Sequence, residues 1–209
     1  MQTLIGRKVG MTRVYDENGA QVAVTVVQVG PCVVTQRKTA ENDGYEAAQL
    51  GFEEQKPQRV AKPQQGHFAK AGVKPQKVLR EVRLADGDDP KVGDVITAKV
   101  FEGVGFVDVL GHTKGRGFQG VIRRYRMAGG RETHGGAWTR RPGSIGNREW
   151  PARVFRNKKM PGQMGSVDIT TQNLRVVKVL ADDNALLLEG AVPGPNGGIV
   201  VVRKAIKKA

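Results

Sequence analysis

Three glycines near the middle of the chain have the spacing of a nucleotide-binding loop. Gly115, Gly117 and Gly120 fit the pattern G-x-G-x-x-G, and a strand-like run at residues 106–110 precedes them. A dinucleotide site of this type also needs a helix after the glycines and a carboxylate about 20 residues further on to bind the ribose. Residues 139–142 stand near that distance and read Thr-Arg-Arg-Pro. We therefore predict no nucleotide cofactor, and we interpret the glycines as positions where the backbone can approach a phosphate chain closely.

No arrangement of a nucleophile and a base is recognisable elsewhere in the sequence. Ser144 and Ser166 are the only serines, and neither lies in a G-x-S-x-G pattern. Cys32 is the single cysteine, so it cannot form an internal disulfide or a zinc site made of thiolates, and a reducing cytoplasm fits this usage. The three histidines have no cluster of acids beside them, which disfavours a metal site. We predict that the protein is not an enzyme and has no cofactor and no small-molecule substrate.

The region around the three glycines carries most of the excess positive charge. The chain has 209 residues and a formal net charge of +14, from 34 Lys and Arg against 20 Asp and Glu. Residues 111–165, here called the basic segment, contain 13 of those basic residues and only two acids, Glu132 and Glu149. Ten of the 13 are arginines, whose planar guanidinium groups bind phosphate through two hydrogen bonds and stack on bases. A solvated charged face is the alternative, but too few acids are nearby to balance the field.

This charge predicts a polyanionic partner, and nucleic acid is favoured over a membrane. A membrane-surface segment would need an amphipathic helix, which the glycines and prolines of residues 111–165 prevent. The chain also has no run of about 18 apolar residues and no apolar region typical of a signal peptide at its N-terminus. We expect a cytoplasmic protein with no membrane partner.

Aromatic side chains are interleaved with the arginines of the basic segment. Trp138, Trp150 and Tyr125 belong to no apolar pattern, and such rings can stack on unpaired bases. Alternatively, they anchor the segment against the rest of the protein, and the sequence leaves both interpretations open. His134 is expected to form a hydrogen bond within the segment or to RNA.

The elements on both sides of the basic segment have the pattern of short strands. The candidates are the runs at 22–29, 33–37, 45–52, 78–84, 95–100, 174–180, 185–189 and 199–203. Short strands at a spacing of about 8–12 residues indicate an all-β barrel or sandwich. We predict a mainly β protein with little helix, apart from a short helix within residues 57–77. Its β-barrel body is built from both ends of the chain, residues 1–110 and 166–209, and residues 111–165 are inserted as a long basic extension.

Ordered motifs along the whole chain resemble the bacterial form of the ribosomal protein L3 family of the large (50S) subunit. The similarity begins at Ile5–Arg13 and continues through residues 43–45 and 66–72. Its most specific part is the series Phe101, Asp108, Gly111, Thr113, Gly115, Arg116, Gly117, Gly120 and Arg124, at the spacings of the family signature. Further matches are Thr133–Gly135, Arg141–Gly146, Arg153–Phe155, Lys158–Met160, Gly162–Gly165 and Gly190–Gly194.

The resemblance implies a structural constituent of the large ribosomal subunit that binds 23S rRNA directly, near the 3′ end of that RNA and early in ribosome assembly. It implies that the extension threads through the rRNA and reaches toward the peptidyl transferase centre without performing chemistry. The tip of the extension would correspond to Ser144–Pro151. Neighbouring ribosomal proteins, including L14 and L19, would be its protein partners.

The predicted rRNA-binding residues are the basic, aromatic and polar side chains of the extension. They are Lys114, Arg116, Arg123, Arg124, Arg126, His134, Trp138, Arg140, Arg141, Ser144, Arg148, Trp150, Arg153, Arg156, Lys158 and Lys159. The alternative function is a free RNA chaperone or a regulatory nucleic-acid-binding protein. Such a protein would bind varied RNA and DNA with similar affinity and would not stay with large subunits.

Overall fold

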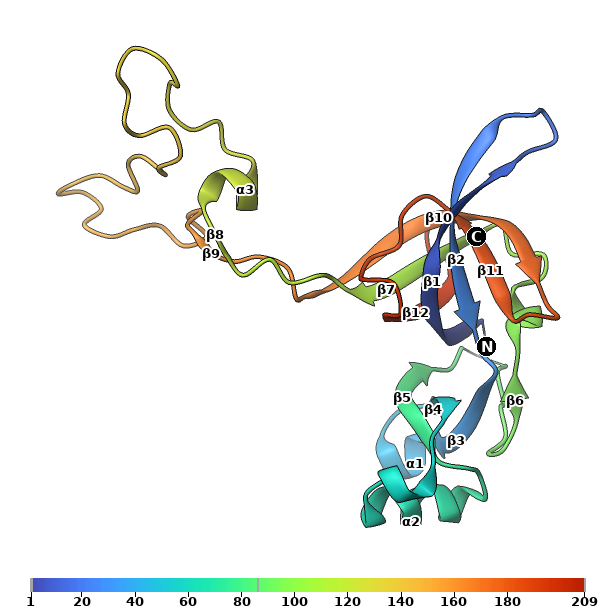
Figure 1. Cartoon of the computed structure of the whole chain (residues 1–209). Coiled ribbons are helices and arrows are strands. Elements are labelled where there is room, and N and C mark those ends of the chain that lie inside the picture. Colours follow the sequence, from blue (N-terminus) through green and yellow to red (C-terminus); the bar gives the residue numbers. More distant parts are fainter. Residues whose placement is uncertain (1, 86, 209) are drawn as a thin grey trace. The chain divides into compact units, whose positions relative to one another are not determined.

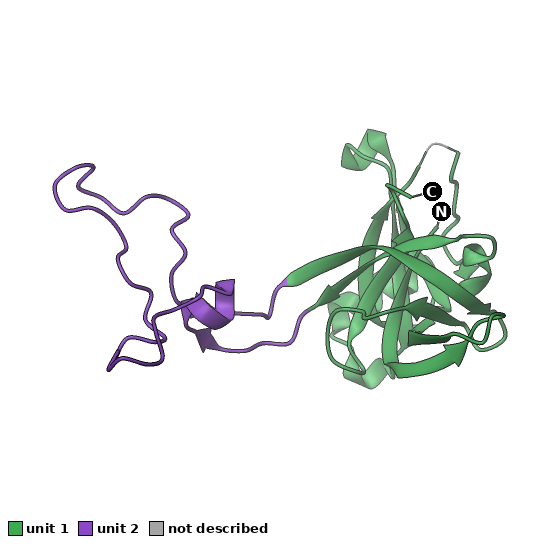
Figure 2. Ribbon diagram, turned by 90° about the horizontal axis from the view of Figure 1, so that it is seen from above, with its two compact units in different colours: residues 1–112, 168–209 green, residues 113–167 purple. Residues whose placement is uncertain are grey.

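The computed structural model describes residues 2–85 and 87–208, and strands predominate in it (Figure 1). The prediction of a mainly β protein with little helix is confirmed. The chain divides into two units (Figure 2), of which unit 1 comprises residues 1–112 with 168–209 and unit 2 comprises residues 113–167.

Unit 1 contains a closed barrel of six strands. In barrel order these are β1 (Thr3–Tyr15), β12 (Ile199–Lys204), β7 (Phe106–His112), β10 (Asp168–Leu180), β11 (Ala185–Glu189) and β2 (Gln21–Val29). Each strand is antiparallel to both of its neighbours. Strands from both ends of the chain therefore close one sheet, which leaves none of these strands with a free edge.

Alternate side chains of the barrel strands form the core, as the two-residue period of a strand requires. The buried pairs are Val27 and Val29 of β2, Val107 and Val109 of β7, Leu186 and Leu188 of β11, and Val200 and Val202 of β12. Their β-branched or leucine side chains fill the barrel with apolar atoms, and burial of such residues is the main source of its stability.

Four further strands form a second sheet in unit 1 instead of joining the barrel. They are β3 (Cys32–Lys38), β4 (Ala47–Glu54), β5 (Gln76–Arg83) and β6 (Val95–Ile96), in the order β5-β4-β3-β6. Gly30 adopts a positive φ of 73° between β2 and β3, and Pro31 has no N–H for a ladder, so the chain leaves the barrel at this turn. Cys32 is buried in the core that joins the two sheets.

The helices of unit 1 are short. They are α1 (Ala40–Asp43), the 3₁₀ turn η1 (Pro57–Arg59), α2 (Lys62–Ala71) and the 3₁₀ turn η2 (Ala98–Phe101). The helix expected within residues 57–77 is α2. The strand expected at residues 95–100 ends at Ile96, because η2 turns the chain so that Ala98 and Phe101 are both buried.

Several motif residues have structural roles in unit 1. Asp108 is buried, and its carboxylate accepts a hydrogen bond from the Asn173 backbone N–H at 2.9 Å. Asn173 has a φ of 58° and lies where the register between β7 and β10 shifts, so Asp108 supports a β-bulge. A Cβ on Gly111 would lie 2.9 Å from the Pro193 carbonyl oxygen, a contact that only glycine avoids.

The end of β7 and the start of β10, between which unit 2 is inserted, lie side by side in the barrel. His112 at the end of β7 pairs with Asp168 at the start of β10. The His112 Nδ1 and a carboxylate oxygen of Asp168 are 2.8 Å apart. Residues 113–167 are therefore an insertion between two strands that are already hydrogen-bonded to each other.

Candidate nucleic-acid interface

Unit 2 begins as two chain segments held together by backbone hydrogen bonds. The Thr113 N–H donates to the Val167 carbonyl at 2.9 Å, and the Arg116 N–H donates to the Met164 carbonyl at 2.8 Å. The short strands β8 (Phe118–Gln119) and β9 (Gly162–Gln163) continue this pairing. The pairing brings the glycine-rich start of the segment beside its C-terminal end.

Gly165 allows the closest approach between these two segments. Its φ is +72°, and a Cβ there would lie 2.1 Å from the Lys114 carbonyl oxygen. A side chain at this position would therefore be strained and would also push the segments apart. The glycine has a packing role in unit 2 whether or not RNA is bound.

The helix α3 (Val121–Tyr125) follows β8 and contains two adjacent arginines with different surroundings. Arg124 is half-buried, its Nη1 donates to the Met160 carbonyl at 2.7 Å, and its Cζ lies 4.9 Å from the centre of the Tyr125 ring. Arg123 is exposed, and its contact is with Gln119 of the preceding strand at 3.5 Å. Arg124 therefore holds the two sides of unit 2 together, whereas Arg123 offers its guanidinium to solvent.

The ring of Tyr125 is covered by cations of unit 2. Besides Arg124, Lys159 places its Nζ 5.8 Å from the ring centre. Cations over a tyrosine face are attracted by its quadrupole. Because Arg124 and Lys159 already lie over the ring, Tyr125 is a weaker candidate for stacking on a base than the sequence alone indicated.

Trp138 contacts the backbone of a glycine turn in its own unit. A Cβ on Gly130 would lie 2.9 Å from two carbons of the Trp138 ring, and the Gly130 N–H donates to the Thr139 carbonyl at 3.0 Å. The indole is nevertheless 53 % exposed. Trp138 thus packs with one part of its ring on unit 2 and leaves the rest open to a partner.

Trp150 has a different environment. It is 87 % exposed, and it belongs to the 144–151 stretch in which residues 144–150 are all exposed. Within this stretch, the Ser144 hydroxyl donates to the Gly146 carbonyl at 3.0 Å, which closes a local turn. Exposure of such a large aromatic ring to water is unfavourable, and stacking on a base would bury it. Trp150 is therefore a better candidate for base stacking than Trp138.

The remaining predicted binding residues of unit 2 are all exposed. They are Lys114, Arg116, Arg126, His134, Arg140, Arg141, Arg148, Arg153, Arg156, Lys158 and Lys159. Among the described residues, no Lys or Arg of unit 2 forms an ion pair within 4.0 Å. Thirteen cations and two acids therefore share a unit in which the positive charge is not neutralised internally.

Unit 2 also lacks an apolar core. Val121 is its single buried residue, and Phe118, Trp138, Trp150 and Phe155 are all more than half exposed. Cationic and aromatic side chains on an open backbone can neutralise phosphates and stack on unpaired bases at the same time. The arrangement suits folded RNA, whose unstacked bases and crowded phosphates offer both kinds of contact.

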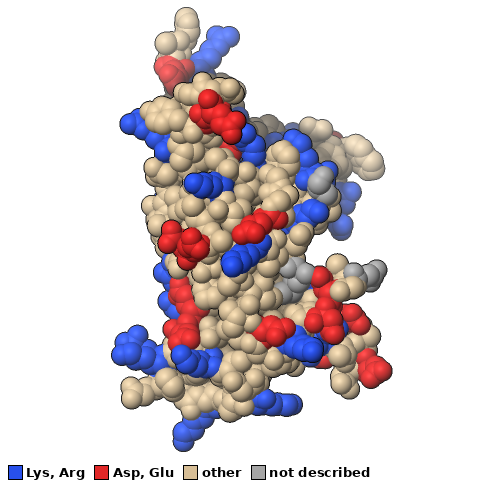
Figure 3. All heavy atoms as spheres, turned by 90° about the vertical axis from the view of Figure 1, so that its right-hand side faces the viewer, with Lys and Arg blue, Asp and Glu red and all other residues tan. Residues whose placement is uncertain are grey.

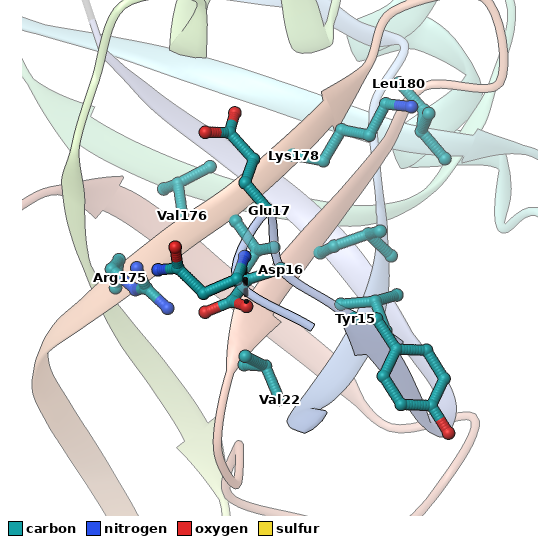
Figure 4. Close-up of a pocket in the computed structure, with 12 residues that line it drawn as sticks. Tyr15, Asp16, Glu17, Val22, Arg175, Val176, Lys178 and Leu180 are labelled. Atoms are coloured by element: carbon teal, nitrogen blue, oxygen red, sulfur yellow. Dashed lines mark hydrogen bonds between the residues drawn. The ribbon is translucent and has the colours of Figure 1, made fainter. Parts of the chain in front are cut away.

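Other kinds of site receive less support from the described residues. An open hollow of about 670 Å³ lies between the β1–β2 hairpin and β10 (Figure 4). Acids at Asp16 and Glu17 and bases at Arg175 and Lys178 surround it together with valines, which is no recognisable catalytic arrangement. No group of three potential metal-binding side chains is found in the described part of the chain. Within residues 2–85 and 87–208, no helix has the length and apolar character needed to cross a membrane.

Comparison with known proteins gives similarity along almost the entire chain. The family model described as Ribosomal protein L3 matches residues 71–185. Large ribosomal subunit protein uL3 of Geobacter sulfurreducens is 51% identical over 204 residues, which cover 98% of this chain and 97% of that protein. The proteins of the same name from Corynebacterium jeikeium and Heliobacterium modesticaldum are 50% and 49% identical, again over 98% of this chain and over 94% and 97% of their own lengths.

Proposed function

Because the chain belongs to the ribosomal protein L3 family, we propose that unit 2 binds 23S rRNA directly and thereby fixes the protein in its particle. Membership of the family makes the protein a structural constituent of the large ribosomal subunit and not an enzyme. It acts in translation as part of that subunit, in the cytoplasm.

The observation that carries this proposal is the unneutralised charge of unit 2. Its 13 basic side chains have only two acids in the same unit, and the pairing of residues 113–119 with residues 162–167 keeps the two ends of the unit close together. Self-repulsion of this kind is relieved when a polyanion binds and releases its counterions. The exposed arginines then contact phosphates, and Trp150 stacks on an unpaired base.

Three finer features belong to the same proposal and come from the family resemblance. The protein binds early in assembly, near the 3′ end of the 23S rRNA. The stretch 144–151 reaches toward the peptidyl transferase centre, where it performs no chemistry. Ribosomal proteins L14 and L19 are its neighbours.

A deletion that removes unit 2 and keeps all six barrel strands tests the RNA-binding role of unit 2. Because His112 and Asp168 are directly paired, residues 113–167 can be replaced by Asn-Gly, which closes a two-residue hairpin between β7 and β10. We expect this shortened chain to melt cooperatively, since the core of unit 1 is intact. We also expect it to lose most of its affinity for 23S rRNA and most of the salt dependence of binding.

The measurement is the dissociation constant for a 23S rRNA transcript over a series of salt concentrations. For the full-length chain, the slope of log K against log[salt] should steepen by about 0.7–0.9 for each neutralised phosphate. A folded, shortened chain that keeps both affinity and slope would place the principal site on unit 1 and contradict the proposal. Equal affinity of the full-length chain for unrelated RNA and DNA, without retention on large subunits, would favour a free RNA chaperone.

A further inference from the structure

Positive charge is also concentrated in one part of unit 1, residues 55–77, although the net charge of the whole unit is small. Outside the basic segment the chain has 21 basic and 18 acidic residues. Residues 55–77 nevertheless contain six basic residues and no acid. They are Lys56, Arg59, Lys62, Lys70, Lys74 and Lys77, and all six are exposed. The remainder of unit 1 is therefore net negative, and its charge is polarised toward η1 and α2.

The elements that carry these cations are fixed to the second sheet. Phe68 of α2 is buried, and His67 lies 2.8 Å from the side-chain oxygen of Gln49 in β4. The Gln65 side chain donates to the carbonyls of Pro57 and Val60, both at 2.8 Å, which ties η1 to α2. The cations thus stand on a rigid support, so a partner would not have to order the backbone beneath them.

Four of the six cations have no ionic partner among the described residues. Lys74 and Lys77 lie 3.2 and 3.5 Å from carboxylates of Glu54 and Glu53. The other four, Lys56, Arg59, Lys62 and Lys70, form no ion pair within 4.0 Å in the described part of the chain. Figure 3 shows one face of the molecule, on which acidic and basic side chains alternate over the middle. Basic side chains extend along the lower left and the bottom edge, at the end where Figure 1 places α2, and acidic side chains lie at the lower right.

Gly66 in the interior of α2 is not explained by packing within the protein. Glycine is less favourable than alanine in a helix, yet a Cβ at Gly66 would meet no atom within 4 Å. Lys62 and Lys70 lie four residues before and after it, which places all three on one helix face, away from the buried Phe68. The position is therefore open for a backbone or phosphate group from outside to approach the helix closely between two lysines.

We propose that Lys56, Arg59, Lys62, Gly66 and Lys70 form a second RNA-binding surface, here called the α2 surface, which contacts the phosphate backbone of the 23S rRNA. It rests on the proposed function only in that the polyanion is this RNA, since the surface lies entirely in unit 1. A phosphate chain fits because these cations form no ion pair within 4.0 Å in the part of the chain that the structure describes, although Asp43 lines a hollow with Lys70 and Glu54 lines one with Lys56. No large apolar side chain of residues 55–77 is exposed to receive a protein side chain. Two cations that flank a bare stretch of helix can each neutralise one phosphate.

The test uses the full-length chain and a 23S rRNA transcript over a salt series. In the double variant Lys62→Ala/Lys70→Ala, we expect the slope of log K against log[salt] to fall by about 1.5, because two phosphate contacts are lost. The matched control is Lys99→Ala/Lys178→Ala, which removes the same charge from exposed positions of unit 1 outside the α2 surface, and its slope should stay near that of the unmodified chain. Equal slopes for both double variants, or an unchanged slope for Lys62→Ala/Lys70→Ala, would overturn the proposal.

A substitution at Gly66 separates binding from folding. Gly66→Gln adds a good helix former where no internal atom is in the way, so we expect the melting temperature to rise. The same side chain obstructs a close phosphate, so we expect affinity for the transcript to fall several-fold. A higher melting temperature with unchanged affinity would show that no phosphate group closely approaches Gly66, which contradicts this part of the proposal.

Variants of unit 2 keep the two proposals distinguishable. Arg123→Ala/Arg156→Ala removes charge only from unit 2, so failure of that pair to lower the slope counts against the proposed function and leaves the α2 surface standing. An acidic protein neighbour is the competing occupant. It would be indicated if Lys62→Ala/Lys70→Ala binds the free transcript normally and yet fails to enter large subunits, a result that overturns the RNA assignment.

Discussion

At the residue scale, adjacent side chains of one type have different roles because their surroundings differ. Arg123 and Arg124 follow each other on α3, but Arg124 donates to the Met160 carbonyl and lies beside the Tyr125 ring. Its removal would disturb unit 2 itself and would confuse a binding experiment. Arg123 and Arg156 are both exposed, so they are the better probes of phosphate contacts.

We predict that Arg123→Ala/Arg156→Ala weakens binding to 23S rRNA and reduces the salt slope by about 1.5. Thermal melting should be unchanged, because neither side chain is buried or ion-paired among the described residues. A filter-binding series across salt concentrations measures the effect. If the slope is unaltered, these two residues are not phosphate contacts.

Cys32 gives a residue-scale prediction for pH. Burial raises the pKa of its thiol from 9.0 to about 11, and the Sγ–H donates to the Ile5 carbonyl at 3.4 Å. The folded state therefore holds this proton more tightly than the unfolded state, so the contribution to stability is complete below pH 9 and is lost as pH rises toward 11. The thiol should also resist alkylation at pH 8 as long as unit 1 is folded.

The measurement is the free energy of unfolding of the unmodified chain and of Cys32→Ala as a function of pH. The difference between the two should be constant below pH 9 and should shift steadily against the unmodified chain between pH 9 and 11. The comparison cancels the titration of lysines and tyrosines, which both proteins share. A difference that does not vary with pH would show that the thiol does not titrate differently in the two states.

At the element scale, the paired segments at the start of unit 2 depend on a glycine. Gly165→Ala places a methyl group where the Lys114 carbonyl oxygen lies, at a φ of +72°. We expect a local cost of about 1–3 kcal/mol and separation of residues 113–117 from residues 162–167. Faster amide hydrogen exchange at Arg116 and Met164, whose N–H groups bridge the two segments, would report this separation.

Gly120→Ala is the matched control for that element. Gly120 precedes α3 with a φ of −69°, and a Cβ there would meet no atom within 4 Å. Exchange at Arg116 and Met164 should remain slow in this variant. If Gly165→Ala also leaves it slow, the close approach at Gly165 is not what holds the segments together.

The two proposed RNA-binding surfaces, on unit 2 and on α2, differ in the elements that support their cations. The basic residues of unit 2 stand on a chain with one buried residue, whereas the α2 surface stands on a helix held by Phe68. Binding at unit 2 therefore includes ordering of the backbone that carries the cations, whereas binding at α2 orders only the side chains. The two contributions to the salt slope should be additive, because they lie in different units and share no partner among the described residues.

At the scale of the whole molecule, stability and RNA binding are assigned to different units. Unit 1 contains one core cluster that joins the barrel and the second sheet, while most of the net charge lies in unit 2. The Asn-Gly replacement of residues 113–167 tests this division directly. It should leave the melting transition nearly unchanged while it removes most of the affinity for RNA, and a loss of both would show that unit 1 needs unit 2 to fold.

The mainly β class and the family could both be predicted from the amino-acid sequence, and the concentration of charge in residues 111–165 can be counted there. Most of the β-branched runs form strands, although the run at 95–100 does so only to Ile96. Charge can be counted without knowing which side chains are exposed. The rRNA contacts of residues 114–159 remain predictions, because residue type and exposure do not identify the nucleotide that each side chain meets.

Which strands pair, and which cations are free of ionic partners among the described residues, could be read only from the folded structure. The barrel joins β1 to β12 and β11 to β2, pairings between distant segments that depend on shared burial and not on local propensity. Packing also separated β3, β4, β5 and β6 into a second sheet, and it left Arg124 half-buried in unit 2 while the neighbouring Arg123 stayed exposed. The positive charge on η1 and α2 is not apparent from the nearly balanced total of 21 basic and 18 acidic residues outside residues 111–165. Such a sum carries no information about where acidic and basic side chains lie in space.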